Sequence, residues 1–252
     1  MSRPAAKSIT FNRRLRSTWI VEGMRLLGEG IAKEAWVKRM TEVISSEISG
    51  ENSITKSMRY LRHIWVEPGE QDVLRREAIQ LYHESSDATR DRVIAWGMAS
   101  ATYPFLFEVA MTTCRMLRVQ PEMKLEQLLR KLCEIYGEKE TVRRSGRYSL
   151  GLIVELGLLQ KAGKAGQYQS VPPVKIADSA LAAWLLRCWQ SASNTEGPID
   201  RMALASHPGL GFFNGAELID AAVLEEVVKI ERLSLATEVI LFEQKSKELT
   251  KG

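Results

Sequence analysis

The sequence is short of the residue types that mark secreted or metal-binding proteins. It has three cysteines in 252 residues, and they stand far apart inside apolar helical patterns. Isolated cysteines of this kind are typical of buried thiols in a reducing compartment and do not indicate a disulfide framework. The three histidines are equally dispersed and show no spacing typical of metal ligands. The residues concerned are Cys114, Cys133, Cys188, His63, His83 and His207.

Motifs that carry common catalytic chemistry are missing as well. The sequence contains no Walker A loop, no GxGxxG and no GxSxG. The stretch GLGF at residues 209–212 lacks a following Gly-Lys and is typical of a turn. Glu225, Glu226 and Glu231 are expected on the solvent face of a long helix and do not resemble a nuclease cluster. We therefore predict a protein that is not an enzyme and that uses no cofactor or metal.

Long apolar runs are also lacking. Spanning a bilayer takes roughly 18 apolar residues, and the most apolar stretch, residues 95–110, is interrupted by Ser, Thr, Pro and Glu108. The first residues, MSRPAAKS, contain no apolar core of a signal peptide. We expect a soluble, cytoplasmic protein that does not associate with a membrane.

What the sequence does have is charge arranged in blocks. The net charge is only +4, but residues 1–66 carry a net +6 and residues 124–175 a net +5. Residues 67–123 carry a net −3 and residues 176–252 a net −4. Two basic blocks thus alternate with two acidic ones, a pattern that the small net charge hides and that requires an explanation.

Apolar residues recur with a helical period along most of the chain, so we predict a mainly α fold, a helical bundle with helix-turn-helix elements. The six tryptophans all lie in apolar patterns and are expected in the core. Alternating residues after Gly157 predict a small β-hairpin, and the final apolar run, LATEVILF, fits either a strand or a helix. The expected helices cover residues 14–27, 33–44, 53–65 with Ser53 as N-cap, 71–83, 86–101, 104–117, 125–136, 141–156 with Thr141 as N-cap, 180–189 and 216–232.

Proline and composition divide the chain into three expected units. The best internal boundary is Gln120-Pro121-Glu122, and Pro172-Pro173 closes the second unit. We expect an N-terminal helical domain over residues 1–120, a winged helix-turn-helix over 121–175, and an acidic helical extension over 176–252. The polar tail from Lys245 is expected to fray.

The middle unit has the element order of a winged helix-turn-helix: helix, short turn, basic helix, small hairpin. Its arginines fall at the N-terminal end of the second helix, the end that enters a major groove and that also favours phosphate. Arginine can hold a phosphate or a guanine edge with two hydrogen bonds. The candidate DNA-binding residues here are Arg143, Arg144, Arg147 and Tyr148 on the helix and Lys161, Lys164 and Tyr168 on the wing.

The N-terminal basic block has a second helix-turn-helix candidate, made of residues 33–44 and 53–65. Lys56, Arg59 and Arg62 form an i, i+3 stripe of cations on its second helix, opposite an apolar face. A solvated helix face explains such a stripe equally well. A basic arm precedes it, with Arg3, Lys7, Arg13, Arg14 and Arg16.

These segments carry a resemblance to a known family. The stretches STWIVEGMRLLGEGIAKEAWVKRMTEV and NSITKSMRYLRHIW resemble the start of BrxA-type proteins, accessory components of bacterial BREX phage-defence systems. Thr55 and Arg59 match that family's Thr-x-x-Arg helix with a spacing one residue longer. The segments ASATYPFLFEVAMTTCRML and YGEKETVRRSGRYSLGLIVELGLL resemble its second half. Over residues 10–172 the resemblance implies a small helical protein that binds DNA through helix-turn-helix elements, whereas residues 176–252 extend beyond the compact family form.

Together these observations predict a non-enzymatic protein that binds double-stranded DNA, with other defence-system proteins as further partners. Two alternatives remain open: a protein-interaction adaptor that docks a partner through the acidic residues 176–252, and a helical RNA-binding protein, since basic helices do not choose between nucleic acids by charge. Oligomeric state and sequence preference are not determined by the sequence, because phosphate contacts carry no code.

Overall fold

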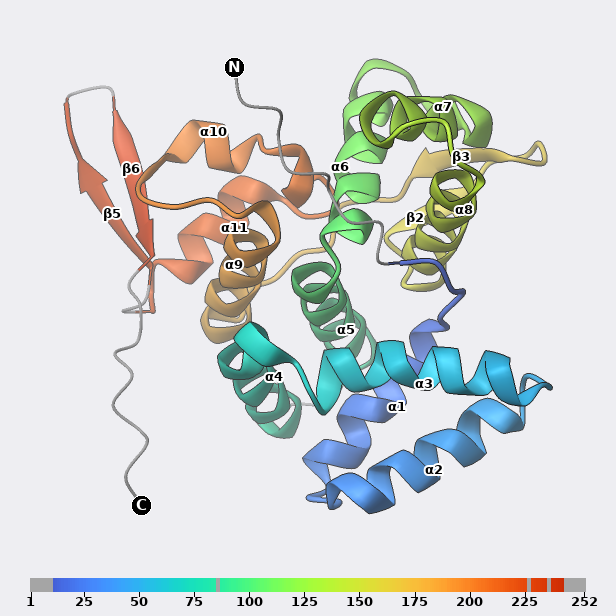
Figure 1. Ribbon diagram of the computed structural model, residues 1–252. Helices are drawn as coiled ribbons and strands as arrows, with labels where there is room; N and C mark the ends of the chain where they lie inside the picture. The colour runs from blue at the N-terminus through green and yellow to red at the C-terminus, as the bar shows by residue number, and fades with distance from the viewer. Residues whose placement is uncertain (1–10, 85–86, 226–227, 235–236, 243–252) are drawn as a thin grey trace.

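The computed structural model describes residues 11–84, 87–225, 228–234 and 237–242. These residues form eleven α-helices, two short 3₁₀ helices and two small three-stranded antiparallel sheets (Figure 1). The prediction of a mainly α protein is confirmed. Arg3, Lys7, Ser86 and the tail from Lys245 lie outside the described residues.

Six helices precede the first strand. The indole N–H of Trp36 donates to the carbonyl of Gly23 at 2.8 Å, and that of Trp65 donates to the carbonyl of Ile20 at 2.9 Å, so α2 and α3 are both held against α1. All six tryptophans are buried, which confirms their predicted place in the core. The helices are α1 (Ser17–Gly28), α2 (Lys33–Ser45), α3 (Glu51–Trp65), α4 (Asp72–Glu84), α5 (Ala88–Thr102) and α6 (Pro104–Val119), with a 3₁₀ turn, η1 (Gly69–Gln71), before α4.

The helix ends follow local sequence rules with some exceptions. Asp87 accepts hydrogen bonds from the backbone of Thr89 and Arg90, as its predicted place at the start of α5 requires. The predicted caps Ser53 and Thr141 are wrong. α3 already begins after Gly50, whose φ of 95° suits glycine, and the later helix begins at Glu140.

α5 and α6 are joined at a sharp bend. Tyr103 ends α5, and Pro104 occupies the first turn of α6, where the missing N–H of proline costs no hydrogen bond. The two helices differ in direction by 113°. Among the described residues, no single helix has both the length and the apolarity to cross a bilayer; the bent pair meets these criteria jointly, and most of its side chains are buried in the protein.

The middle of the chain forms one helical and one sheet layer at the upper right of Figure 1. β1 pairs with β3, and β3 with β2, so the sheet order is β1-β3-β2. Gly137, with a φ of 90°, ends α7 as predicted, and Gly146 lets α8 approach Leu129 and Leu132. The elements are β1 (Glu122–Lys124), α7 (Leu125–Tyr136), α8 (Glu140–Glu155), β2 (Leu159–Lys161) and β3 (Gln167–Ser170). The predicted hairpin is confirmed.

The C-terminal part packs α9 against α5 and α11 against α9, with a second sheet of order β4-β6-β5 at the left of Figure 1. Close contact between α5 and α9 depends on Gly97, since a Cβ there would lie 2.5 Å from the ring of Trp184. The elements are α9 (Ser179–Ser193), β4 (Ile199–Asp200), α10 (Arg201–Ala205), η2 (Pro208–Leu210), α11 (Gly215–Ala222), β5 (Val228–Arg232) and β6 (Glu238–Phe242).

The predicted long helix over residues 216–232 is wrong. It ends at Ala222, and residues 228–232 form β5, whose Ile230 lies opposite Ile240 of β6. Apolar residues here alternate with polar ones, and they pack against apolar residues of the paired strand. The segment therefore forms a strand although its apolar residues also fit a helical spacing. Glu231 therefore lies on a strand and not on a helix face, and Glu226 lies outside the described residues. The final apolar run, left open between strand and helix, is a strand.

Buried residues from all parts of the chain form one hydrophobic cluster. Contacts between α5 and α9 and between α6 and α8 connect the three predicted units through this core. The division into 1–120, 121–175 and 176–252 stays a prediction about sequence organisation.

Candidate nucleic-acid interface

The three arginines of the second basic block all lie in the first two turns of α8. The inner side of these turns is buried through Val142, Ser145 and Gly146. Arg144 and Arg147 are exposed and Arg143 is partly exposed, with a side-chain exposure of 27%. The helix thus presents its cations on the outer face, as an amphipathic helix over a core requires.

Acidic residues accompany two of these arginines. Arg143 pairs with Glu126 and, at 3.5 Å, with Glu138, while Arg147 lies 3.6 Å from Glu140 and 3.9 Å from Glu126. The carboxylates are 63–75% exposed, so these are surface pairs, each worth about 0–1 kcal/mol, that a stronger anion can replace. Arg144 has no ion pair or side-chain hydrogen bond within the part of the chain that the structure describes.

The three residues predicted to lie on a wing, here the β2–β3 hairpin, differ in their exposure. Lys161, at the end of β2, and Lys164, in the turn between the strands, are exposed. Tyr168 lies between Met123 and Lys161 in the sheet register, and its ring packs against the hydrophobic core. Burial raises the pKa of its hydroxyl. Only part of this tyrosine is therefore available to a partner.

The cations of α3 are also distributed unevenly. Lys56 and Arg59 are exposed, and the Arg59 guanidinium lies 5.8 Å from the ring centre of Tyr60. Arg62 pairs with Glu67, which also accepts a hydrogen bond from Lys33 at 2.9 Å. Lys56 and Arg59 are thus the more accessible members of the stripe.

The two basic blocks meet in the structure. Arg14 forms an ion pair of 3.0 Å with Glu155 at the end of α8, and the backbone N–H of Ser17 donates to the same carboxylate at 3.2 Å. Tyr148 of α8 and Ser53 of α3 line one notch of about 430 Å³. We name this cavity the α3–α8 notch; sequence reasoning missed it, because no local pattern relates residues so far apart.

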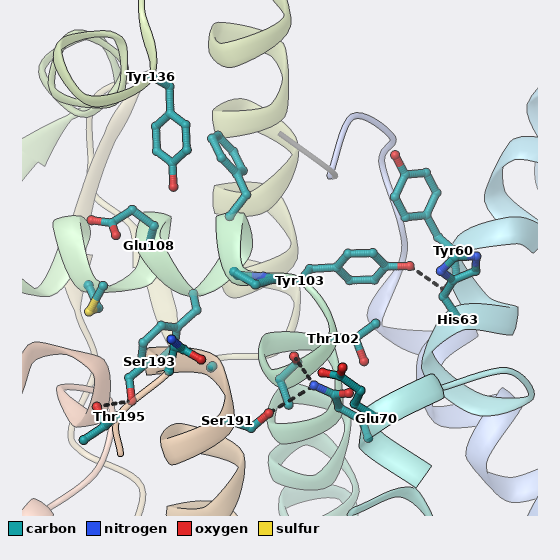
Figure 2. A pocket seen from close by; sticks show the side chains of 18 of the residues that line it. Tyr60, His63, Glu70, Thr102, Tyr103, Glu108, Tyr136, Ser191, Ser193 and Thr195 are labelled. Atoms are coloured by element: carbon teal, nitrogen blue, oxygen red, sulfur yellow. Dashed lines mark hydrogen bonds between the residues drawn. The ribbon is translucent and has the colours of Figure 1, made fainter. Parts of the chain in front are cut away.

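A larger cleft of about 1190 Å³ lies where α3, α6, α7 and α9 approach one another (Figure 2). Tyr103 donates its hydroxyl hydrogen to the Tyr60 carbonyl at 2.9 Å, and Tyr60 donates to the side-chain oxygen of Asn12 at 2.8 Å. Glu108 is 7% exposed and lies 3.6 Å from Arg115. Burial raises the pKa of Tyr136, with the Glu108 carboxylate adding to the effect, so this phenol stays protonated. The lining thus combines aromatic rings with many polar and charged side chains, among them Arg59, Arg115 and Glu70.

Two of the groups able to ligate metals or attack a substrate, His207 and Cys114, are held in buried surroundings. No group of three His, Cys, Asp or Glu side chains among the described residues is arranged to bind a metal ion. The Nδ1 atom of His207 accepts hydrogen bonds from Trp189 and from the backbone of Gly209, both at 3.0 Å. Burial raises the pKa of Cys114 to about 12, which keeps the thiol protonated.

Comparison with protein-family models, with curated proteins and with solved structures gives no match for this chain. The resemblance to BrxA-type proteins therefore stays a prediction from the quoted residues.

Proposed function

We propose that the protein binds double-stranded DNA without catalysis, and that α6 through β3 form a winged helix-turn-helix. The observation that carries this proposal is the element order α6-β1-α7-α8-β2-β3 together with the sheet order β1-β3-β2. In such a unit the second helix of the pair enters the major groove and the hairpin lies beside it. Here that helix is α8, with its arginines at the leading end.

Charge and helix polarity support the same surface. The N-terminal turn of α8 offers backbone N–H groups and a partial positive charge, which favour phosphate. Arg144 is exposed and can contact DNA directly, and Arg143 and Arg147 can exchange exposed carboxylates for phosphates. Lys161 and Lys164 extend the positive surface along the wing.

The arginine triple variant Arg143→Ala, Arg144→Ala and Arg147→Ala tests the proposal. We expect at least tenfold weaker binding to a labelled 20-base-pair duplex and a salt slope reduced by about 0.9 for each phosphate that the variant no longer neutralises. Fluorescence anisotropy at several salt concentrations measures both. Lys175→Ala, an exposed cation after the wing, is the control with a smaller charge change. A folded triple variant that binds like the native chain would refute the assignment.

We also propose that this binding serves a phage-defence system similar to BREX, in which other defence proteins are partners. The support is the resemblance over residues 10–172. Genes for a phosphatase-like protein, a methyltransferase and a large ATPase beside this one would support the proposal, and a neighbourhood without them would count against it.

A second candidate function is that of a protein-interaction adaptor, and one observation favours it. Met202, Leu224 and Leu233 are between 66% and 78% exposed in the acidic C-terminal part. Absence of duplex binding at low salt by the native chain would favour this function. Stronger competition by A-form RNA than by B-form DNA would instead favour RNA binding, since the two differ in groove shape.

A further inference from the structure

The α3–α8 notch lies between the segment that leads into α1, the N-terminal end of α3, and α8. Figure 1 shows that segment, in dark blue, passing between α8 above and α3 below. The notch residues used below are Arg13, Arg14, Arg16, Ser53, Ser57 and Tyr148. Two basic blocks that residues 67–123 separate in the sequence thus contribute to one cavity.

The charge of the notch is positive after its internal ion pairs are counted. Arg14 pairs with Glu155, and Arg16 lies 2.9 Å from Glu47, whose other oxygen accepts a hydrogen bond from Trp19 at 2.9 Å. Arg13 is partly exposed and has no ion pair or side-chain hydrogen bond within the described ranges. One full cationic charge is therefore available for an anion.

Hydrogen-bond donors converge on the same cavity. α3 lines the notch with Ser53 and Ser57, and the backbone N–H of Ser53 already donates to the Gly50 carbonyl at 2.9 Å, so the donors that α3 offers here are side-chain hydroxyl groups. Ser57, one turn further along, is only 2% exposed, lines the notch, and has no side-chain hydrogen bond to any residue that the structure describes. The Ser57 oxygen can be reached from the notch although the residue as a whole is buried, so its hydroxyl can donate to an acceptor bound there.

We propose that the α3–α8 notch binds a phosphate group, and that in the protein's function this is a phosphodiester of the DNA held by α8. The inference rests on the proposed function and extends it. Arg13 supplies the charge, while the hydroxyl groups of Ser57 and Tyr148, which both line the notch, supply hydrogen bonds. Because one wall belongs to α8 and another to α3, a phosphate bound here joins both basic blocks to the same duplex.

Single substitutions test the site in the full chain. We expect Arg13→Ala to weaken duplex binding five- to twentyfold and to reduce the salt slope by about 1. We expect Ser57→Ala to weaken binding about three- to tenfold with an unchanged salt slope. Ser57→Ala removes no hydrogen bond within the described residues and introduces a stronger helix former, so thermal stability is expected to stay the same or rise. Lys175→Ala serves as the matched control and is expected to bind within twofold of the native chain.

Competition by inorganic phosphate distinguishes a site for a DNA phosphodiester from a site for a free phosphate anion. A site for a backbone phosphodiester is expected to bind free phosphate weakly, with competition against duplex only at millimolar concentrations. Tight binding of inorganic phosphate that Arg13→Ala abolishes, with duplex affinity unchanged in that variant, would overturn the proposal in favour of a free-anion site.

The two proposals can fail separately. Duplex binding that the α8 arginine triple variant loses but Arg13→Ala and Ser57→Ala retain would reject the notch and leave the proposed function standing. A native chain that binds no duplex would reject the proposed function, and with it the phosphodiester.

Discussion

At the residue scale, the structure separates side chains that hold the fold from those available to a partner. His207 belongs to the first group, because its Nδ1 accepts two hydrogen bonds and its ring lies edge-on to Trp189, 5.0 Å away between centres. Burial lowers its pKa, and the cations Arg115 and Arg118 lower it further. The folded protein thus keeps this imidazole neutral.

We predict that this histidine makes stability fall as the solution becomes acidic. Since its pKa is lower in the folded state than in the unfolded state, the unfolded chain binds more protons below about pH 6.5, and the stability gained from a neutral His207 is lost as pH falls from there. Urea denaturation between pH 7.5 and 5 measures the slope. His207→Gln is expected to have a lower stability and a shallower slope over this range, and an equal slope in both proteins would contradict the prediction.

The exposed cations belong to the second group. Sequence reasoning placed Arg143, Arg144 and Arg147 on one helix end, which the structure confirms as the start of α8. It did not find the partners of Arg143, nor that Tyr168 packs on the core, because both depend on neighbours that are distant in the chain. Neither charge nor a motif distinguishes Ser57 in the sequence. Its role in the proposed site follows only from its position in the notch.

At the scale of elements, the close contact between helices α5 and α9 depends on a glycine. α5 and α9 connect the N-terminal helices to the C-terminal part, and the contact is closed by the Trp184 ring over Gly97, with the indole N–H bonded to the Leu74 carbonyl at 2.9 Å. Trp184 is therefore fixed at both its ring and its polar atom.

We predict that Gly97→Ala destabilises the protein by about 1–3 kcal/mol, because the new methyl group would lie 2.5 Å from a ring that cannot move aside. Gly151→Ala in α8 is the matched control. Its added Cβ would meet no atom of the described residues within 4 Å, so the substitution is expected to stabilise by about 0.5–1 kcal/mol through helix propensity. Chemical denaturation compares the two, and equal stabilities would show that α5 and α9 are not in close contact.

Most elements followed from local patterns, and the exceptions have a common cause. The helix of residues 125–136 was predicted with its observed bounds, because its apolar stripe and the following glycine both lie within it. β1 and β4 were missed since each has only two or three residues and exists through pairing with β3 or β6. Residues 228–232 were assigned to a helix for the same reason: their strand is stabilised by a partner ten residues further on.

At the scale of the whole molecule, the small net charge conceals a separation of basic and acidic segments onto different sides. The basic segments 1–66 and 124–175 meet at the α3–α8 notch, whereas the acidic C-terminal part forms the other side of Figure 1. A duplex lying along α8 and the notch would contact the basic side and avoid the acidic one.

We predict that duplex affinity depends steeply on salt. If six to ten phosphates are neutralised, the association constant should fall by about 10³–10⁵ between 50 and 200 mM salt as counterions return to the DNA. Anisotropy titrations across this range give the slope of log affinity against log salt. A slope of log affinity against log salt near zero would mean that the basic blocks do not contact the phosphate backbone of the DNA.

The sequence by itself determined the helical class, the order helix, turn, basic helix and hairpin, and the positions of the cations along that order. Each of these depends on periodicity and end signals within a few residues. Only the tertiary structure decided that Arg14 reaches Glu155, 141 residues away, that Tyr148 shares a cavity with the start of α3, and that the last apolar runs pair as strands. The physical reason is that such contacts reflect how buried faces pack together, and the free energy of packing belongs to pairs of distant segments that no local pattern contains.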